Sequence, residues 1–408
     1  MATGRSRSIF SGIIQSFNSK LKFSNNSDLV GLDENAVPNR RSPLIYSQIV
    51  PLERSLLKFA ASESGTTGVG TVLVINTGGA IGMQKVEDVY RPKQHFLTKY
   101  LIQMPIFNDL KFWDRAPKTT SEHSPDRGRY STQTPSTVSV PLAMPLNENG
   151  RRIIYRFLEY NTLLDSSDCN LEVWIKLALD IEQFYDHFDG FVILHGTDTL
   201  PYAASALSFI LENLSKPIVM TGSELPIDRL RNDGRHNLLG SLLIAGGGYD
   251  IPEVTVFVQN EGFLHSFISA VLGGSLLPIE FIADYETESF TTLFTIWKWV
   301  FDDFTKLRVP NSLFLILQLY RGNRIVKMAT TDLVAFTSPN SKPLAEMKEV
   351  VNVYEDRIFR RTKHNSKKLT IQTNLCPDVA ILRLFPSISV EAVRSFFKPP
   401  MKGKLHVV

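Results

Sequence analysis

Two short stretches place hydroxyl, carboxylate and glycine residues directly after apolar runs. In INTGGAIG, Thr77 precedes Gly78 and Gly79, and in HGTDT, Thr197 and Asp198 follow the run FVIL. Glycines tolerate positive φ and let backbone N–H groups approach a ligand, so a threonine at such a turn presents its hydroxyl to whatever binds there. Taken alone, TGG favours an ordinary tight turn or a phosphate-binding loop. Asp198 alone is equally compatible with an N-cap of the helix that follows.

The elements around these stretches alternate between strands and helices from Thr71 onward. The runs TVLVIN, FVIL, KPIVMTG and EVTVFV are typical of buried strands, and NLEVWIKLALDIEQFYDHF, PYAASALSFILENL and GRHNLLGSLLIAGGG are typical of helices. This alternation predicts an α/β fold with a mostly parallel sheet flanked by helices. Because the carboxyl ends of parallel strands meet at one edge of a sheet, we expect Thr77, Thr197 and Asp198 to share a crevice.

Composition excludes several classes of function. The 408 residues, 43% hydrophobic and 21% charged, can bury a large core and predict two domains. A net charge of +3 gives no reason to expect nucleic acid, and the two cysteines form no metal or disulfide pattern. No HExxH, P-loop lysine or GxSxG motif occurs. We therefore expect no cofactor, no metal ion and no membrane association, and a cytoplasmic location.

Longer stretches carry a resemblance to a known family. INTGGAIGMQ, LLDSSD, DGFVILHGTDTLPYAASALSFILENLSKPIVMTGSELPI and NDGRHNLLGSLLIA resemble the type I (cytosolic) class of L-asparaginases, including the asparaginase-like part of the animal 60 kDa lysophospholipases. The match runs from about Thr71 to the C-terminus with interruptions. It implies hydrolysis of L-asparagine to L-aspartate and ammonia through a threonine nucleophile and an acyl-enzyme. It also implies a smaller second α/β domain and assembly as a homodimer or homotetramer.

The resemblance assigns roles to individual residues. It implies that Thr77 is the nucleophile and that Tyr90, on a flexible loop, assists it. A second cluster consists of Thr197, Asp198 and Lys216. The substrate is held by Gly78, Ser166, Ser167 and Asp198, with the two serines on its α-carboxylate.

The chemistry requires such residue types, because a threonine hydroxyl is a weak nucleophile that needs a proton acceptor and a stabilised oxyanion. A tyrosine or lysine of lowered pKa could shuttle the proton, and backbone N–H groups of the glycine turn could form the oxyanion hole. Asp198 would bind the α-ammonium of the substrate. Without the resemblance, Tyr90 and Lys216 are each compatible with ordinary surface positions. We interpret His195 as structural.

The sequence departs from the family at several places. Ala80 stands where the family has a second threonine. Residues 261–318 form an aromatic and apolar stretch that the family lacks, which we interpret as retained intronic sequence rather than a genuine insertion, with a membrane span as a third possibility. The C-terminal stretch matches only the first strand and helix of the second domain.

These departures set the expected domain boundaries and the alternatives. We expect a disordered or leader segment over residues 1–70, with a transit peptide as the alternative. An asparaginase N-terminal domain follows over 71–345, and a linker with the start of a truncated C-terminal domain over 346–408. The competing functions are an inactive truncated isoform that retains the fold or ligand binding, and a lysophospholipase-like hydrolase.

Overall fold

The computed structural model describes residues 52–65, 68–117, 140–260, 316–330, 335–348, 350–360, 368–383, 385–396, 398 and 403–407. All of them belong to one unit, Ile49–Val408. The predicted leader therefore lies mostly outside the described residues, and so does most of the stretch 261–318. Three residues of that stretch, 316–318, are described and form part of a strand.

A nine-stranded mixed sheet organises the fold, in the order β14-β13-β10-β9-β8-β6-β1-β5-β4. Five neighbouring strands, β5, β1, β6, β8 and β9, run parallel to one another. Antiparallel strands extend this core at both sides. The strands are β1 (Val69–Gly78), β4 (Leu142–Ala143), β5 (Arg152–Leu164), β6 (Gly190–Leu194), β8 (Ile218–Thr221), β9 (Val254–Asn260), β10 (Ile316–Arg321), β13 (Ala345–Met347) and β14 (Val351–Val353). The predicted mostly parallel sheet is confirmed.

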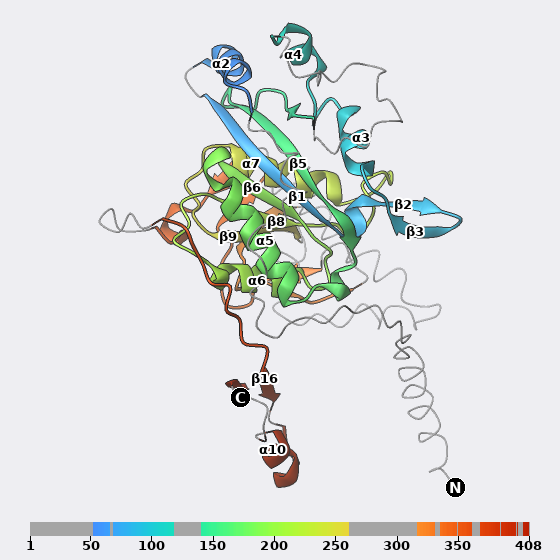
Figure 1. Cartoon of the computed structure of the whole chain (residues 1–408), viewed down its shortest axis with the longest axis vertical. Coiled ribbons are helices and arrows are strands. Elements are labelled where there is room, and N and C mark those ends of the chain that lie inside the picture. The colour runs from blue at the N-terminus through green and yellow to red at the C-terminus, as the bar shows by residue number, and fades with distance from the viewer. Residues whose placement is uncertain are drawn as a thin grey trace, which may run out of the picture. The chain divides into compact units, whose positions relative to one another are not determined.

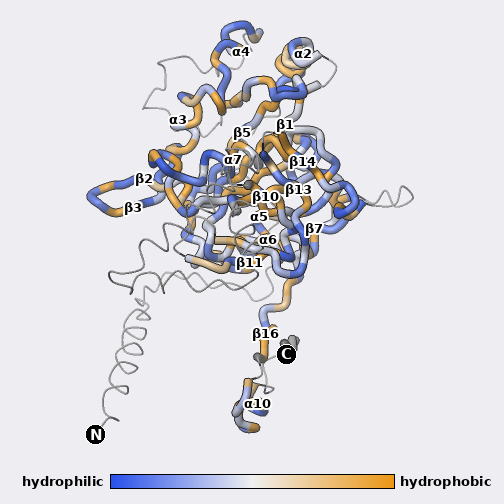
Figure 2. The backbone as a smooth tube through the Cα atoms, turned by 180° about the vertical axis from the view of Figure 1, so that it is seen from behind, coloured by the Kyte–Doolittle hydropathy of each residue, from blue (hydrophilic) through white to orange (hydrophobic). Residues whose placement is uncertain are grey.

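Helices cover both faces of this sheet, with α5 (Leu171–Phe184) and α6 (Leu200–Ile210) on one face and α7 (Gly234–Gly246) on the other (Figure 1). Alternate strand residues point to opposite faces. Val72 and Val74 accordingly pack in one buried cluster with Leu238 and Leu242 of α7. The tube view shows β1, β5 and α7 as mostly hydrophobic (Figure 2). Burial of both faces explains why the central strands read as continuous apolar runs.

Smaller elements surround the sheet. Two short helices, α3 (Phe96–Ile102) and α4 (Leu110–Arg115), follow the hairpin of β2 (Met83–Val86) and β3 (Val89–Pro92). The other small pairings are β7 (Leu211–Glu212) with β15 (Thr370–Ile371), β11 (Val326–Lys327) with β12 (Phe336–Thr337), and β16 (Val379–Arg383) with β17 (Gly403–Val407). Strands β16 and β17 are parallel, and α10 (Val390–Phe396) lies between them in the sequence. This strand–helix–strand order agrees with the expected start of a second α/β domain.

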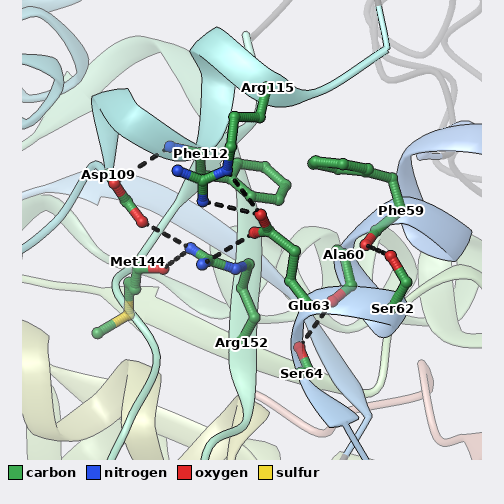
Figure 3. A network of polar contacts seen from close by, with 10 residues as sticks. All are labelled: Phe59, Ala60, Ser62, Glu63, Ser64, Asp109, Phe112, Arg115, Met144 and Arg152. Carbon is green, nitrogen blue, oxygen red and sulfur yellow. Dashed lines mark hydrogen bonds and ion pairs between the residues drawn. The ribbon is translucent and has the colours of Figure 1, made fainter.

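The structure differs from the expectation for residues 54–63, which form helix α2 (Arg54–Glu63) instead of continuing a leader. Glu63 of α2 accepts from the guanidinium groups of Arg152 on β5 and Arg115 on α4 (Figure 3). Arg152 also donates to Asp109 at 3.0 Å, and its guanidinium lies 4.4 Å from the ring centre of Phe112. Because the Arg152 side chain is only 3% exposed, this network ties α2 to the sheet.

Candidate active site

Thr77 lies at the carboxyl end of β1, beside the end of β6. Its hydroxyl donates a hydrogen bond to the carbonyl oxygen of Leu194 at 2.9 Å, and the residue is buried. This contact fixes the direction of the hydroxyl hydrogen toward β6. The lone pairs of Oγ1 are therefore the part of the group that remains to meet an electrophile.

The two glycines after Thr77 have the positive φ angles that the motif predicted, 129° at Gly78 and 86° at Gly79. Their N–H groups are already engaged, however. Gly78 N donates to the Asn76 side chain at 3.2 Å, and Gly79 N donates to the Leu164 carbonyl at 3.1 Å. In this conformation neither N–H is available to an oxyanion, contrary to the expected use of this turn.

Close contacts join the turns at the carboxyl ends of four strands. A Cβ built on Gly79 would lie 2.7 Å from Gly196 Cα, and one on Gly196 would lie 2.6 Å from Ser166 Cβ. A Cβ on Gly222, which follows β8, would lie 3.3 Å from Thr197 Cγ2. The turns after β1, β5, β6 and β8 therefore pack on one another at one sheet edge, as expected from the parallel direction of the strands.

A lysine that the sequence analysis missed lies at this edge. The ammonium group of Lys327, on β11, donates to Thr197 Oγ1 at 2.9 Å, to Asp198 Oδ1 at 2.8 Å and to Glu224 Oε2 at 3.2 Å. An ammonium group has three donors, so these three acceptors saturate it. The Lys327 side chain is 9% exposed and that of Asp198 is 64% exposed. Lys327 is therefore held inside the site while Asp198 reaches solvent.

Glu224 is the second residue that the sequence analysis missed. Its side chain is 15% exposed, and its Oε1 lies 2.9 Å from Lys327 Nζ. The backbone around it is fixed by Asp233, which precedes α7 and accepts from the N–H groups of Glu224 at 3.0 Å and Leu225 at 3.3 Å. Asn237 holds the same turn by donating to Gly222 O at 2.9 Å. Helix α7 thus positions Glu224.

The pKa values of Glu224 and Lys327 are both raised, but for different reasons. Burial raises the pKa of Glu224, although hydrogen bonds from Lys327 and Thr197 oppose this. Burial alone would lower the pKa of Lys327, but its contacts with Asp198 and Glu224 outweigh burial and raise the pKa above its ordinary 10.5. At neutral pH Lys327 is therefore an ammonium ion, which donates to Thr197 and has no lone pair to accept a proton.

The two predicted serines occupy different positions. Ser166 is buried, its Cβ and Oγ face Gly196, and its carbonyl oxygen accepts from Thr199 Oγ1 at 2.6 Å. Ser167 is exposed, and its hydroxyl donates to Asp165 at 2.9 Å. The structure therefore brings Ser166 to the clustered turns, and the Ser167 hydroxyl caps its own turn instead.

Two predicted site residues lie elsewhere. Tyr90 is on the β2–β3 hairpin, with the Arg229 guanidinium 5.6 Å from its ring centre. Among the described residues, no hydrogen bond, ion pair or ring contact joins Tyr90 to Thr77. Lys216 precedes β8 and donates to the carbonyls of Tyr185 and Phe188, the latter at 2.8 Å. Because Lys216 lies at the amino end of that strand, it is on the sheet edge opposite Thr197.

His195 fits its structural interpretation. The ring is fully buried, with Nδ1 2.8 Å from Gly196 O and Nε2 3.3 Å from the sulfur of Cys169. Burial lowers its pKa, so the ring is neutral at pH 7. Within the described ranges no cluster of His, Cys, Asp and Glu could hold a metal ion. None of the described helices combines the length and the hydropathy that a bilayer crossing requires.

The signals for the missed residues differ. Glu224 follows the strand KPIVMTG, so the rule that singled out Thr77 and Thr197 applies to it equally. Lys327 ends a two-residue strand and has no periodic pattern around it. The resemblance implies a lysine at this site, but Lys216 lies before the amino end of β8 and Lys327 is the lysine that contacts Thr197.

Comparisons with known proteins identify the family of this chain. The family described as Asparaginase, N-terminal, matches residues 71–359. An L-asparaginase of Dirofilaria immitis is 35% identical over 81% of this chain and 43% of its own length. A 60 kDa lysophospholipase of Mus musculus is 34% identical over 81% of this chain and 45% of its own length.

The chain thus spans less than half of either curated relative. The crystal structure of L-asparaginase I from Vibrio cholerae superposes with a TM-score of 0.53 and 26% identity, covering 84% of this chain and 72% of that one. The family match includes the turns that carry Thr77, Thr197 and Lys327. The chain belongs to the asparaginase family.

Proposed function

We propose that this chain hydrolyses L-asparagine to L-aspartate and ammonia, with Thr77 as the nucleophile. Family membership supports an amidohydrolase. The observation that carries the proposal is the cluster in which Lys327 binds Thr197 and Asp198 at the sheet edge where β1 presents Thr77. A buried cation that binds an exposed carboxylate and one hydroxyl, at the sheet edge that carries a second hydroxyl, suits a small zwitterionic amide better than a plain amide or a lipid.

Substrate binding follows from charge. Asp198 is the most exposed member of the cluster, so we assign it to the α-ammonium of the substrate, a charge-assisted contact. Ser166, which packs against the turn before Thr197, is assigned to the α-carboxylate. These two contacts direct the side-chain amide of the substrate toward the threonines.

The reaction then has two balanced halves. Oγ1 of Thr77 forms a bond to the carboxamide carbon, its proton passes to the leaving nitrogen, and ammonia departs to leave an ester. Water attacks that ester, gives its proton back to Oγ1 and releases L-aspartate. Thr77 gains its orientation from the Leu194 carbonyl, but a carbonyl oxygen is not a base, so a separate proton acceptor is required. We assign this role to Tyr90, which the β2–β3 hairpin must then bring to Thr77.

Ammonia release by the purified chain with L-asparagine tests the proposal, with L-glutamine and lysophosphatidylcholine as parallel substrates. Thr77→Ala should remove turnover, Thr77→Ser should retain part of it, and Thr370→Ala, at an exposed site on β15, should leave it unchanged. Intact-mass detection of an aspartyl ester that Thr77→Ala cannot form identifies the nucleophile. Saturable binding of L-asparagine without ammonia release would favour the binding-only alternative and contradict the enzyme. Release of fatty acid alone would favour the lipid hydrolase.

A further inference from the structure

The ion cluster of the site contains one more carboxylate than it needs. Lys327 carries one positive charge, whereas Asp198 and Glu224 carry two negative charges, both within 3.2 Å of its ammonium nitrogen. The cluster therefore has a net charge of −1 before substrate binds. An α-ammonium group would bring it to zero.

The two carboxylates differ in their access to solvent. Asp198 is 64% exposed and follows β6, where an incoming ligand can reach it, whereas Glu224 is 15% exposed. Glu224 Oε1 has no hydrogen-bond partner among the described residues, although it lies 2.9 Å from the ammonium group. Glu224 can thus strengthen its ion pair with Lys327 through this second oxygen. Its backbone need not move, because Asp233 holds it in place.

If Asp198 turns toward the substrate, Lys327 loses one of its three acceptors. A buried ammonium without a counter-ion is strongly unfavourable. Glu224 removes this cost because its carboxylate remains beside Lys327 and can present both oxygens to it. The charge of Asp198 then becomes available to the ligand.

We propose that Glu224 is the dedicated counter-ion of Lys327, a positioning residue that releases Asp198 to bind the α-ammonium of the substrate. This inference rests on the proposed function for the identity of the ligand, but its electrostatic part concerns residues of this chain alone. The titratable groups that face Lys327 and Glu224 are Asp198, from the turn after β6, and Asp233, from the start of α7. The Phe336 ring on β12 lies 5.8 Å from the ammonium and carries no charge.

The first test measures Lys327 itself. Glu224→Gln keeps the shape of the side chain and removes its charge, so the lysine should lose its proton more easily. Competitive labelling with acetic anhydride, read at Lys327 by peptide mass spectrometry, should be at least about tenfold faster at a fixed alkaline pH, which corresponds to one pKa unit. The control is Glu253→Gln, because Glu253 is also buried and pairs with a cation, Arg321, before the amino end of β9. It should leave Lys327 labelling unchanged.

The second test measures what Asp198 is free to do. The wild-type chain should prefer L-asparagine over succinamate, which lacks the α-ammonium, in kcat/KM. This preference should fall at least about tenfold in Glu224→Gln, mainly through KM, and the ionisation seen in the alkaline part of its pH profile should move to lower pH. Glu224→Asp, which keeps the charge, should restore most of the preference. Thermal unfolding identifies any variant that fails to fold, and Glu224→Asp then carries the comparison.

The outcomes separate the two proposals. Unchanged Lys327 labelling in a folded Glu224→Gln chain overturns the counter-ion role, whatever the activity. A wild-type chain without turnover, but with faster labelling in Glu224→Gln, refutes the proposed hydrolysis and retains Glu224 as the counter-ion. A retained preference for L-asparagine over succinamate in Glu224→Gln, despite faster labelling, overturns the release of Asp198.

Discussion

The contact between the turns after β1 and β6 predicts a large effect of one added methyl group. Gly79→Ala changes a residue at φ 86° whose new Cβ would lie 2.7 Å from both Cα and N of Gly196. Carbon atoms prefer separations of about 3.5–4.0 Å, so one turn must move by about 1 Å. With ψ at 172°, Gly79 lies in a backbone region that essentially only glycine adopts, and a non-glycine residue there costs about 1–3 kcal/mol. Overpacking adds about 1–3 kcal/mol, so we expect a loss of about 2–6 kcal/mol in the free energy of unfolding.

A second glycine separates these two contributions. Gly248 has nearly the same φ, 85°, but a Cβ there would only touch the flexible guanidinium of Arg151 at 3.4 Å. Gly248→Ala should therefore lose only the backbone part, about 1–2 kcal/mol. Urea denaturation of both variants measures the difference, which isolates the contact between Gly79 and Gly196.

Enzyme activity should respond more strongly than stability to Gly79→Ala, because the shift between the two turns also moves Thr77 relative to Thr197. A displacement of about 1 Å in a reacting group can reduce the rate about 100-fold. We expect such a loss in kcat/KM for L-asparagine in Gly79→Ala and less than about threefold in Gly248→Ala. Equal stability and equal activity of the two variants would refute the packing of these turns as the structure has it.

Three further results are expected. Arg152→Met should destabilise the chain by about 3 kcal/mol, since it breaks a buried ion network. Arg115→Met, at a side chain that is 52% exposed, should destabilise it far less in the same denaturation assay, because solvent screens an exposed ion pair. Equal losses would contradict the network. Lys327→Met should abolish ammonia release, whereas Lys216→Met should lower only the melting temperature. The reverse pattern would favour Lys216 as the lysine of the site. Burial lowers the pKa of His195 below its ordinary 6.5. Below about pH 6.5 the unfolded chain therefore binds more protons than the folded chain, and the free energy of unfolding should fall as the pH falls. His195→Gln should reduce this pH dependence, measured by unfolding at pH 5 and 7.

The sequence predicted those features of the fold that depend on periodicity and chain direction. Apolar runs located β1, β6, β8 and β9, and helical spacing located α5. A proline at the start of α6 and glycines at the end of α7 located those two helices, because all of these signals are local in the sequence. The rule that parallel strands end at one edge then placed Thr77 and Thr197 together. Helix α2 was not predicted, because the contact between Glu63 and Arg152 that ties it to the sheet joins residues 89 positions apart.

The site was predicted less completely, and the error over lysine has a geometric cause. Thr221 pairs with Leu194 at the carboxyl ends of β8 and β6. Lys216 precedes Thr221 by five residues, which at about 3.3 Å per residue places it about 16 Å along the strand. A lysine side chain cannot span that distance. Lys327 reaches the edge from β11, and no local pattern in the sequence connects β11 to β6.

The same strand directions determine where additional chain can enter this fold. Strand β9 runs parallel to β8, so its carboxyl end lies at the sheet edge that carries Thr77, Thr197 and Glu224. Strand β10 returns antiparallel, with Ile316 opposite Asn260. The last residue of β9 and the first residue of β10 therefore lie opposite each other in the sheet. The chain runs from the end of β10 at Arg321 to Lys327 on β11 within six residues. The register of β10 against β9 therefore also determines where Lys327 lies.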